Sequence, residues 1–299
     1  MVKELKVVGT NLVDIDNKQI MLKGISNHGL SWYPQYVNKE TMSFFKKDFN
    51  INAYRLAMYT YEENGYCICD DEWRQYLLEV IDRGVKAAID LDMYIIIDWH
   101  ILYDSNPLTY LELAKGFFGK MAQLYGNIPN VIFEICNEPN KDCDWNDIKK
   151  YSNIIIPISR KYSNNIIVVG TPTWSQDVDL VCGDALEYQN IMYALHFYSS
   201  THKDDLRQKL ECALKNGLPV FISEFGVVEA SGNGFIDHEQ YRIWFDLIKK
   251  YNLSHFCWNL SNRDEASAIL KPNINKLSNF TDEDYNEAGL IYKYHFIND

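Results

Sequence analysis

The sequence predicts a single α/β domain, a (β/α)8 TIM barrel covering residues 1–299. Short apolar runs rich in Val and Ile recur along the chain without clean alternation, which is typical of parallel strands buried on both faces. Helical patterns lie between these runs, and no Pro/Ser/Gly-rich linker divides the chain. A closed barrel of this kind takes about 250 residues. The alternative, a doubly wound sheet with a nucleotide site, lacks both a G-x-G-x-x-G segment and a P-loop here.

The first predicted element is a β-hairpin over residues 12–22, expected to close the bottom of the barrel. Val13 and Ile15 alternate with Asp14 and Asp16, and Asn17 adds turn chemistry after Asp16. The predicted barrel strands follow at residues 21–27, 53–59, 94–100, 131–138, 166–174, 191–198, 220–224 and 256–259.

Helices are predicted between the strands from the spacing of apolar residues. Leu77, Leu78, Ile81, Val85 and Ala88 fall on one helical face. Similar patterns cover residues 111–125, 148–162 and 238–251. The repeated strand–helix alternation favours a closed barrel over an open sheet.

Charge and composition favour an uncharged ligand. The formal net charge is −12, which disfavours nucleic acid, anionic membranes and polyanionic substrates as partners. The 21 Tyr and 7 Trp residues include many that must be core, while others are candidates for stacking on sugar rings.

Cysteine content and the first residues bear on the expected compartment. The seven cysteines are odd in number and imply no full disulfide framework. Residues after Met1 are charged and alternating rather than an apolar leader, and no apolar run reaches about 18 residues. We expect a secreted or cell-surface monomer whose leader is absent from this sequence; a cytoplasmic location stays open.

Ionisable and aromatic side chains stand where the predicted strands end, which is where barrel enzymes place their active sites. Glu138 and Glu224 end strands four and seven, on opposite sides of the barrel mouth. Glycoside hydrolysis needs two carboxyl groups flanking one bond. Each glutamate alone also fits an ion-paired or helix-capping carboxylate, but the two together favour catalysis. Other polar or aromatic residues at strand ends are Arg55, His100, Asn137, His196, Tyr198 and Trp258.

In these segments the chain resembles glycoside hydrolase family 5, cellulase family A, and especially its bacterial endo-β-1,4-glucanases. The resemblance runs from about Leu12 to the C-terminus. Its residues are Gly24 to Trp32, Arg55, Ile97 to His100, Ile135 to Pro139, His196 to Tyr198, Ser223 to Gly226 and Trp258 to Leu260.

The resemblance implies a retaining double-displacement mechanism with Glu138 as acid/base and Glu224 as nucleophile. Arg55 is the cation expected to keep Glu224 ionised, and Tyr198 a donor to Glu224. Asn137 matches the residue that binds the sugar 2-hydroxyl.

The resemblance also implies a set of substrate contacts. Trp258 would lie beneath the sugar at the cleaved bond, with His100 and His196 bonding hydroxyls or carboxylates. His28, Trp32, Arg263 and Glu265 would meet the glycone end, although the family more often has Lys in place of Arg263. Trp174 resembles an aglycone platform. Tyr59 lines or underlies the cleft, and Asp98 and Trp99 are support or packing residues.

Several alternatives stay open. A β-mannanase, xylanase or xyloglucanase would use the same catalytic pair, because loop contacts decide the sugar. A carbohydrate-binding barrel without turnover needs aromatic platforms but not two opposed carboxylates. A metal-dependent barrel hydrolase needs more well-spaced ligands than His28, His100 and His196 provide. We therefore expect a β-glucan substrate, no cofactor and no metal.

Overall fold

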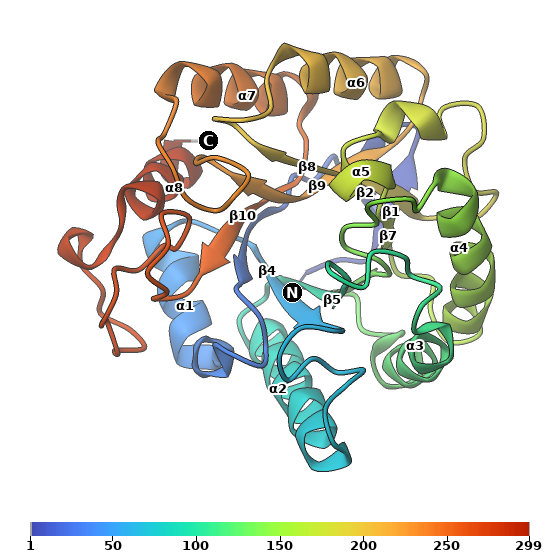
Figure 1. Cartoon of the computed structure of the whole chain (residues 1–299), viewed down its shortest axis with the longest axis horizontal. Coiled ribbons are helices and arrows are strands. Elements are labelled where there is room, and N and C mark those ends of the chain that lie inside the picture. The colour runs from blue at the N-terminus through green and yellow to red at the C-terminus, as the bar shows by residue number, and fades with distance from the viewer. Residues whose placement is uncertain (1, 299) are drawn as a thin grey trace.

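The computed structural model describes residues 2–298, and its centre is a closed barrel of parallel strands (Figure 1). The eighth barrel strand pairs in parallel with the first, which closes the ring. In chain order the barrel strands are β3 (Lys23–Asn27), β4 (Ala53–Tyr59), β5 (Tyr94–His100), β6 (Val131–Glu134), β7 (Ile167–Val169), β8 (Ile191–Tyr198), β9 (Val220–Gly226) and β10 (His255–Leu260). The predicted (β/α)8 barrel is confirmed.

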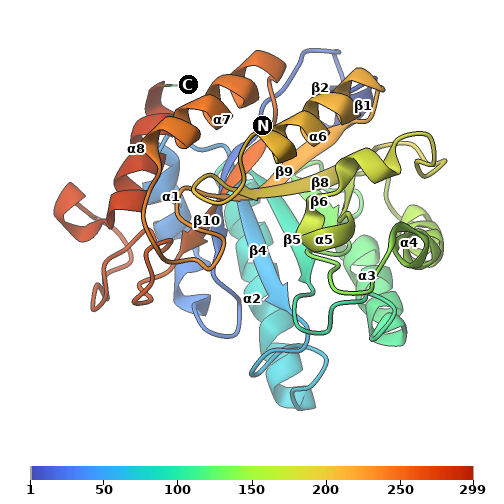
Figure 2. The ribbon, with the colours of Figure 1, turned by 45° about the horizontal axis from the view of Figure 1, so that its top comes forward.

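Helices surround the barrel in the order that their connections require (Figures 1 and 2). They are α1 (Lys39–Asp48), α2 (Asp71–Asp90), α3 (Leu111–Tyr125), α4 (Trp145–Arg160), α5 (Pro172–Ser175), α6 (Asp204–Lys215), α7 (His238–Tyr251) and α8 (Glu287–Asn298). Short 3₁₀ segments are η1 (Pro34–Tyr36), η2 (Val178–Val181) and η3 (Asp282–Asp284). After β7, the four-residue α5 and η2 stand in place of a long outer helix.

Local sequence signals set where several helices begin. Asn38, Asp70, Asp144 and Asp237 each precede a helix and accept a hydrogen bond from a backbone N–H of its first turn. Such caps satisfy donors that have no partner within the helix. Each of these helices therefore begins at a defined residue, which fixes the end of the loop that connects it to the preceding strand.

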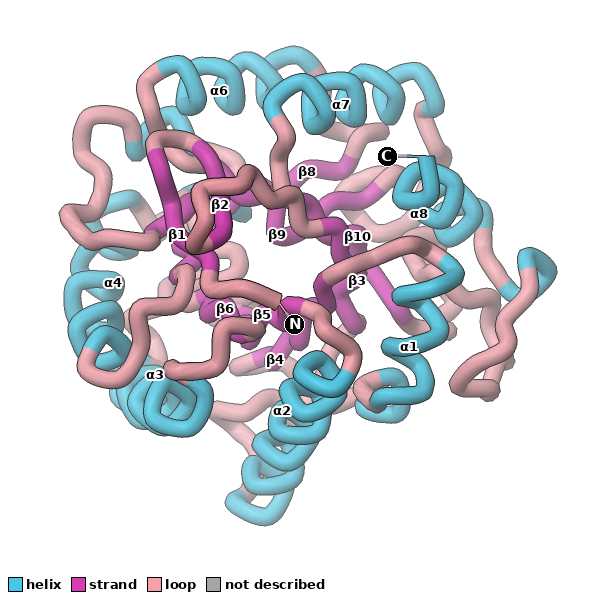
Figure 3. Tube along the Cα trace, turned by 180° about the vertical axis from the view of Figure 1, so that it is seen from behind, coloured by secondary structure: helices cyan, strands magenta, loops and turns pink. Residues whose placement is uncertain are grey.

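The N-terminal hairpin exists, but its strands differ from the prediction. β1 (Leu5–Val8) pairs antiparallel with β2 (Asn11–Asp14), whereas the predicted turn after Asp14 leads only to an isolated bridge between Val13 and Gln19. Figure 3 shows the hairpin across one end of the barrel. Leu5 and Leu12 join the buried cluster of inward-facing barrel residues at that end. The hairpin thus covers the amino-terminal end of the barrel.

Two predicted strands extend beyond the C-terminal ends of the real ones. β6 ends at Glu134, so Glu138 lies in the loop after the strand rather than within it. β7 ends at Val169, and the backbone of Thr173 and Trp174 turns into the left-handed region. After β6 only Ile135 and Cys136 continue the apolar run, and after β7 the chain continues with Gly170, Thr171 and Pro172. Both predictions therefore extended the strands into the loops at the barrel mouth.

Candidate active site

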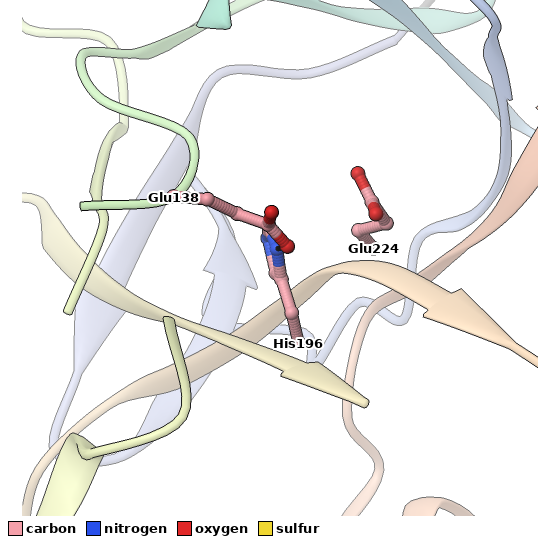
Figure 4. A group of neighbouring side chains, drawn as sticks. All are labelled: Glu138, His196 and Glu224. Atoms are coloured by element: carbon pink, nitrogen blue, oxygen red, sulfur yellow. Dashed lines mark hydrogen bonds and ion pairs between the residues drawn. The ribbon is translucent and has the colours of Figure 1, made fainter. Parts of the chain in front are cut away.

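The two glutamates approach each other across the barrel mouth, as Figure 4 shows. Glu138 lies after β6 and Glu224 lies on β9. One carboxylate oxygen of each, together with a ring nitrogen of His196, all lie within 4.8 Å of one another. Retaining glycosidases hold their carboxyl groups about 5–5.5 Å apart, and inverting enzymes about 6.5–9.5 Å. The separation fits direct attack by one carboxylate.

Arg55 is the fully buried cation at the centre of the site. Its Nε donates to Glu134 Oε2 at 2.7 Å, and one terminal nitrogen donates to Glu224 Oε2 at 3.1 Å. The other terminal nitrogen lies 3.0 Å from Asp98 Oδ2 and donates to Asn137 Oδ1 at 2.6 Å. One guanidinium therefore holds three buried carboxyl groups and orients an amide.

The pKa of Glu224 does not follow the expectation that Arg55 keeps it low. Burial and the nearby Glu138 raise the pKa of Glu224, against the opposing effects of His196, Arg55 and a hydrogen bond from Tyr198 Oη at 2.9 Å. The guanidinium is shared with other carboxylates, so its charge does not offset the desolvation of Glu224.

Arg55 also acts on Glu134, a buried carboxylate that was not predicted as a site residue. Burial alone would raise the pKa of Glu134, but Arg55 and His196 lower it to about 2. Burial raises the pKa of Asp98 well above its usual range despite the same guanidinium. The charge of Glu134 and Arg55 is thus a fixed part of the barrel floor.

His196 connects the floor to Glu138. Its Nδ1 lies 2.9 Å from Glu138 Oε1, and its Nε2 lies 2.9 Å from Ser223 Oγ and 3.8 Å from Glu134 Oε1. Burial favours the neutral ring, but the Glu134 and Glu138 carboxylates raise the pKa of His196 to about 9. His196 is therefore a cation at neutral pH that donates to Glu138.

Asn137 lies beneath the cleft rather than on its surface. Its side chain is fully buried, and its amide nitrogen lies 3.1 Å from the Ile101 carbonyl and 3.2 Å from His100 Nε2. His100 Nδ1 lies 2.6 Å from Asp98 Oδ2. Both ends of the amide are engaged, so Asn137 orients Arg55 and His100. Its contact with a sugar 2-hydroxyl stays a prediction.

Trp258 and His100 both line the cleft that holds the carboxylates. Their rings stack at a centroid distance of 5.2 Å and an angle of 12°. The Tyr59 ring packs against His100 at a centroid distance of 4.1 Å and against Trp32 at 4.5 Å. Tyr59 is one of the residues that line the cleft. Stacked rings of this kind suit the apolar face of a pyranose.

The predicted glycone contacts gather at the loops after β3 and β10. Arg263 forms an ion pair with Glu265 at 3.1 Å and lies 3.4 Å from His28 Nε2. Burial and Arg263 lower the pKa of His28 to about 4, so the ring is neutral. Trp32 lies beside them, with its Nε1 donating to the Glu63 carbonyl. This corner combines an indole face with charged hydrogen-bonding groups.

Trp174 stands apart from this corner, after β7. It is 42% exposed, and its backbone N–H donates to the Pro139 carbonyl at 2.9 Å. The left-handed backbone at Trp174 and its two neighbours directs the side chain into the same cleft, which has a volume of about 1120 Å³.

Twelve of the fourteen predicted site residues line this cleft, while Arg55 and Asn137 lie beneath it.

Sequence reasoning missed two members of the site. Glu134 and Ser223 hold Arg55 and His196 from below. A glutamate inside the apolar run Val131–Glu134 was a usable indication, because a buried charge needs a partner. Asp98, left as support or packing, is a direct partner of Arg55.

Glu138, His196 and Glu224 are also the one group among residues 2–298 with the spacing of a three-ligand metal site. A metal ligand must present an unprotonated ring nitrogen, and His196 is protonated at neutral pH. A metal ion would have to displace the proton that the neighbouring carboxylates favour on His196.

Comparisons with known proteins agree with this geometry. The family described as "Cellulase (glycosyl hydrolase family 5)" matches residues 13–264. Endoglucanase A of Butyrivibrio fibrisolvens is 47% identical over 288 residues, covering 96% of this chain and 67% of that protein. An endoglucanase of Clostridium saccharobutylicum is 48% identical, covering 97% and 64%. The chain thus spans about two thirds of the length of these relatives.

Solved structures show the same fold. Cellulase Cel5C_n superposes with a TM-score of 0.93 and 38% identity, covering 98% of this chain and 91% of that one. The catalytic domain of Thermobifida fusca endoglucanase Cel5A in complex with cellotetraose superposes with a TM-score of 0.91 and 28% identity, covering 98% and 97%. The chain therefore belongs to the cellulase family, glycosyl hydrolase family 5.

Proposed function

We propose that this protein is a retaining endo-β-1,4-glucanase that cleaves internal bonds of cellulose or related β-glucans. The observation that carries the proposal is the pair Glu138 and Glu224, with carboxylate oxygens within 4.8 Å in an open cleft. The endoglucanase names of the relatives and the cellotetraose bound by the Thermobifida fusca enzyme support the choice of β-1,4-glucan.

In the first step Glu138 donates its proton to the glycosidic oxygen while Glu224 attacks the anomeric carbon. The leaving chain departs with the proton, and a covalent glycosyl ester forms on Glu224. Arg55 and Tyr198 each donate to one oxygen of Glu224, which fixes the carboxylate for attack. Glu224 loses its negative charge in the ester and regains it when the ester is cleaved. The same two donors therefore also stabilise the carboxylate that leaves in the second step.

In the second step Glu138 removes a proton from water, which attacks the same carbon and releases Glu224. Protonated His196 donates to Glu138 at 2.9 Å, so it stabilises the carboxylate form that the base step requires. Two inversions return the original configuration, so the product retains the β anomer.

The family resemblance supports a direction for the substrate in the cleft. His28, Trp32, Arg263 and Glu265 form the glycone end, and Trp174 forms an aglycone platform. Trp258 lies under the sugar at the cleaved bond, beside His100. A linear glucan with uncharged hydroxyls fits a chain whose net charge is −12.

A Glu138→Ala variant tests the proposal with an activated aryl cellobioside, whose leaving group needs no proton. The first step should proceed and the second should stall, so a glycosyl-enzyme accumulates. Added azide, which needs no base, should restore turnover and give a β-glycosyl azide. A full rate without azide, or an α-azide product, would overturn the assignment.

Glu224→Gln is the matched control. It removes the nucleophile but keeps the shape of the side chain. Neither the aryl cellobioside nor azide should restore its turnover, while cello-oligosaccharide binding and the melting temperature stay close to those of the parent. Azide rescue of this variant in place of Glu138→Ala would exchange the two roles.

We also propose that the protein is a secreted or cell-surface monomer. Cellulose and related glucans are extracellular polymers, so an enzyme that acts on them must meet them outside the cell. No helix within residues 2–298 has the length and apolar character to cross a membrane. Light scattering of the purified protein and fractionation of the producing cells test the two parts of this proposal.

A further inference from the structure

The order of strands around the barrel divides the rim of the cleft into ends and flanks. The glycone residues follow β3 and β10, which are neighbours, and Trp174 follows β7 on the far side. A glucan that runs between these ends passes the loops after β4 and β5 on one side. The loops after β8 and β9 lie on the other side.

The flank made by the loops after β4 and β5 exposes large side chains. Tyr61, Ile68 and Tyr103 all line the cleft and are 46%, 50% and 68% exposed. The Tyr61 ring stacks on Tyr110 at 6.4 Å and 26°, which restricts its orientation. Clustered exposed apolar side chains mark binding surfaces more often than single ones do. We call Tyr61, Ile68 and Tyr103 the tyrosine flank.

Reciprocal hydrogen bonds hold the two loops of the tyrosine flank together. The backbone N–H of Tyr103 donates to Glu62 Oε1 at 2.9 Å, from the second loop to the first. Thr60 Oγ1 donates to Asp104 Oδ2 at 2.9 Å, from the first loop to the second. The rings are therefore presented from a defined backbone, and little entropy is lost when a ligand stacks on them.

The geometry of a bound β-1,4-glucan determines which of its groups face the tyrosine flank. Successive units of a β-1,4-glucan are rotated by half a turn, so their O6 groups point alternately to the two flanks. A sugar attached at O6 therefore projects sideways onto a flank and not along the cleft. Aromatic rings offer such a branch a stacking face.

We propose that the tyrosine flank is a binding site for a single sugar branch at O6 of the main chain, so that the substrate class includes branched β-1,4-glucans. This inference rests on the proposed endoglucanase function, which sets the direction of the main chain. Tyr103 supplies the exposed stacking face, Tyr61 the second ring and Ile68 an apolar contact.

The test compares kcat/KM for cellopentaose and for a cello-oligosaccharide that carries xylose at O6. Tyr103→Ala and Tyr61→Ala should each lower kcat/KM for the branched substrate by about 3- to 10-fold, the range of one ring contact. Values for cellopentaose should stay within about twofold. Tyr294→Ala, on α8 and 70% exposed outside the cleft, is the matched control and should change neither value.

Each other outcome overturns the inference in a recognisable way. If the parent cleaves cellopentaose but not the branched substrate, the flank excludes branches. If both substrates lose rate equally in the variants, the tyrosines bind the main chain or hold the loop. If the parent cleaves neither substrate, the proposed endoglucanase function itself fails. Melting temperatures equal to that of the parent show that any loss of rate is not a loss of fold.

Discussion

At the scale of single residues, Arg55 joins the chemistry to the stability of the barrel. It is fully buried and contacts Asp98, Glu134 and Glu224 within 3.1 Å. Removing one member of a buried ion cluster leaves uncompensated charge. We expect Arg55→Met to lower the free energy of unfolding by about 3–5 kcal/mol and to abolish turnover. Urea unfolding measures the first effect.

Arg263→Met is the control for this prediction, because Arg263 pairs with Glu265 at 3.1 Å but is half-exposed. Exposed ion pairs contribute about 0–1 kcal/mol, so this variant should unfold near the parent's midpoint. Equal losses in the two variants would show that the charge cluster around Arg55 carries no special stability.

At the scale of elements, the sequence predicted what depends on local pattern. The bounds of β4, β5, β8, α3 and α7 agree with the prediction, because the apolar pattern of each segment is local. The pairing of β2 with β1 and the early ends of β6 and β7 did not follow, because they depend on distant partners. Glu134 belongs to the same class: its partner Arg55 lies 79 residues away.

The turn after β7 shows an element shaped by the site. Thr173, Trp174 and Ser175 have φ near 56–57°, which costs L-residues about 1–2 kcal/mol each. Trp174 reaches the cleft from this turn. We expect Thr173→Gly to be more stable than Thr173→Ala by about 0.5–1 kcal/mol, since both lose the bond to Asp177 and only glycine relieves the backbone.

A helix position provides the control with the opposite sign. Gln123 is exposed within α3, where glycine should be less stable than alanine by about 1 kcal/mol. Chemical denaturation of the four variants tests the pair of differences. Glycine less stable than alanine at position 173 as well would mean that the turn stores no backbone strain.

At the scale of the whole molecule, the buried charges make stability depend on pH. Glu134, with a pKa lowered to about 2, contributes stability above pH 4.5 that is lost as the pH falls toward 2. His196, with a pKa raised to about 9, contributes stability that is fully present below pH 6.5. That contribution is lost as the pH rises through 9, so the alkaline side of the stability profile depends on His196.

The neutral variant His196→Gln isolates this alkaline effect. The parent should exceed the variant in unfolding free energy by a constant amount below about pH 6.5, and the excess should shrink by roughly 3 kcal/mol on reaching about pH 10. Urea unfolding at several pH values measures it. His238→Gln, at a histidine of α7 whose side chain is 54% exposed, is the control variant. A constant difference between parent and His196→Gln across this range would mean that the ring is neutral, and the stabilisation of ionised Glu138 by a cationic His196 would then fail with it.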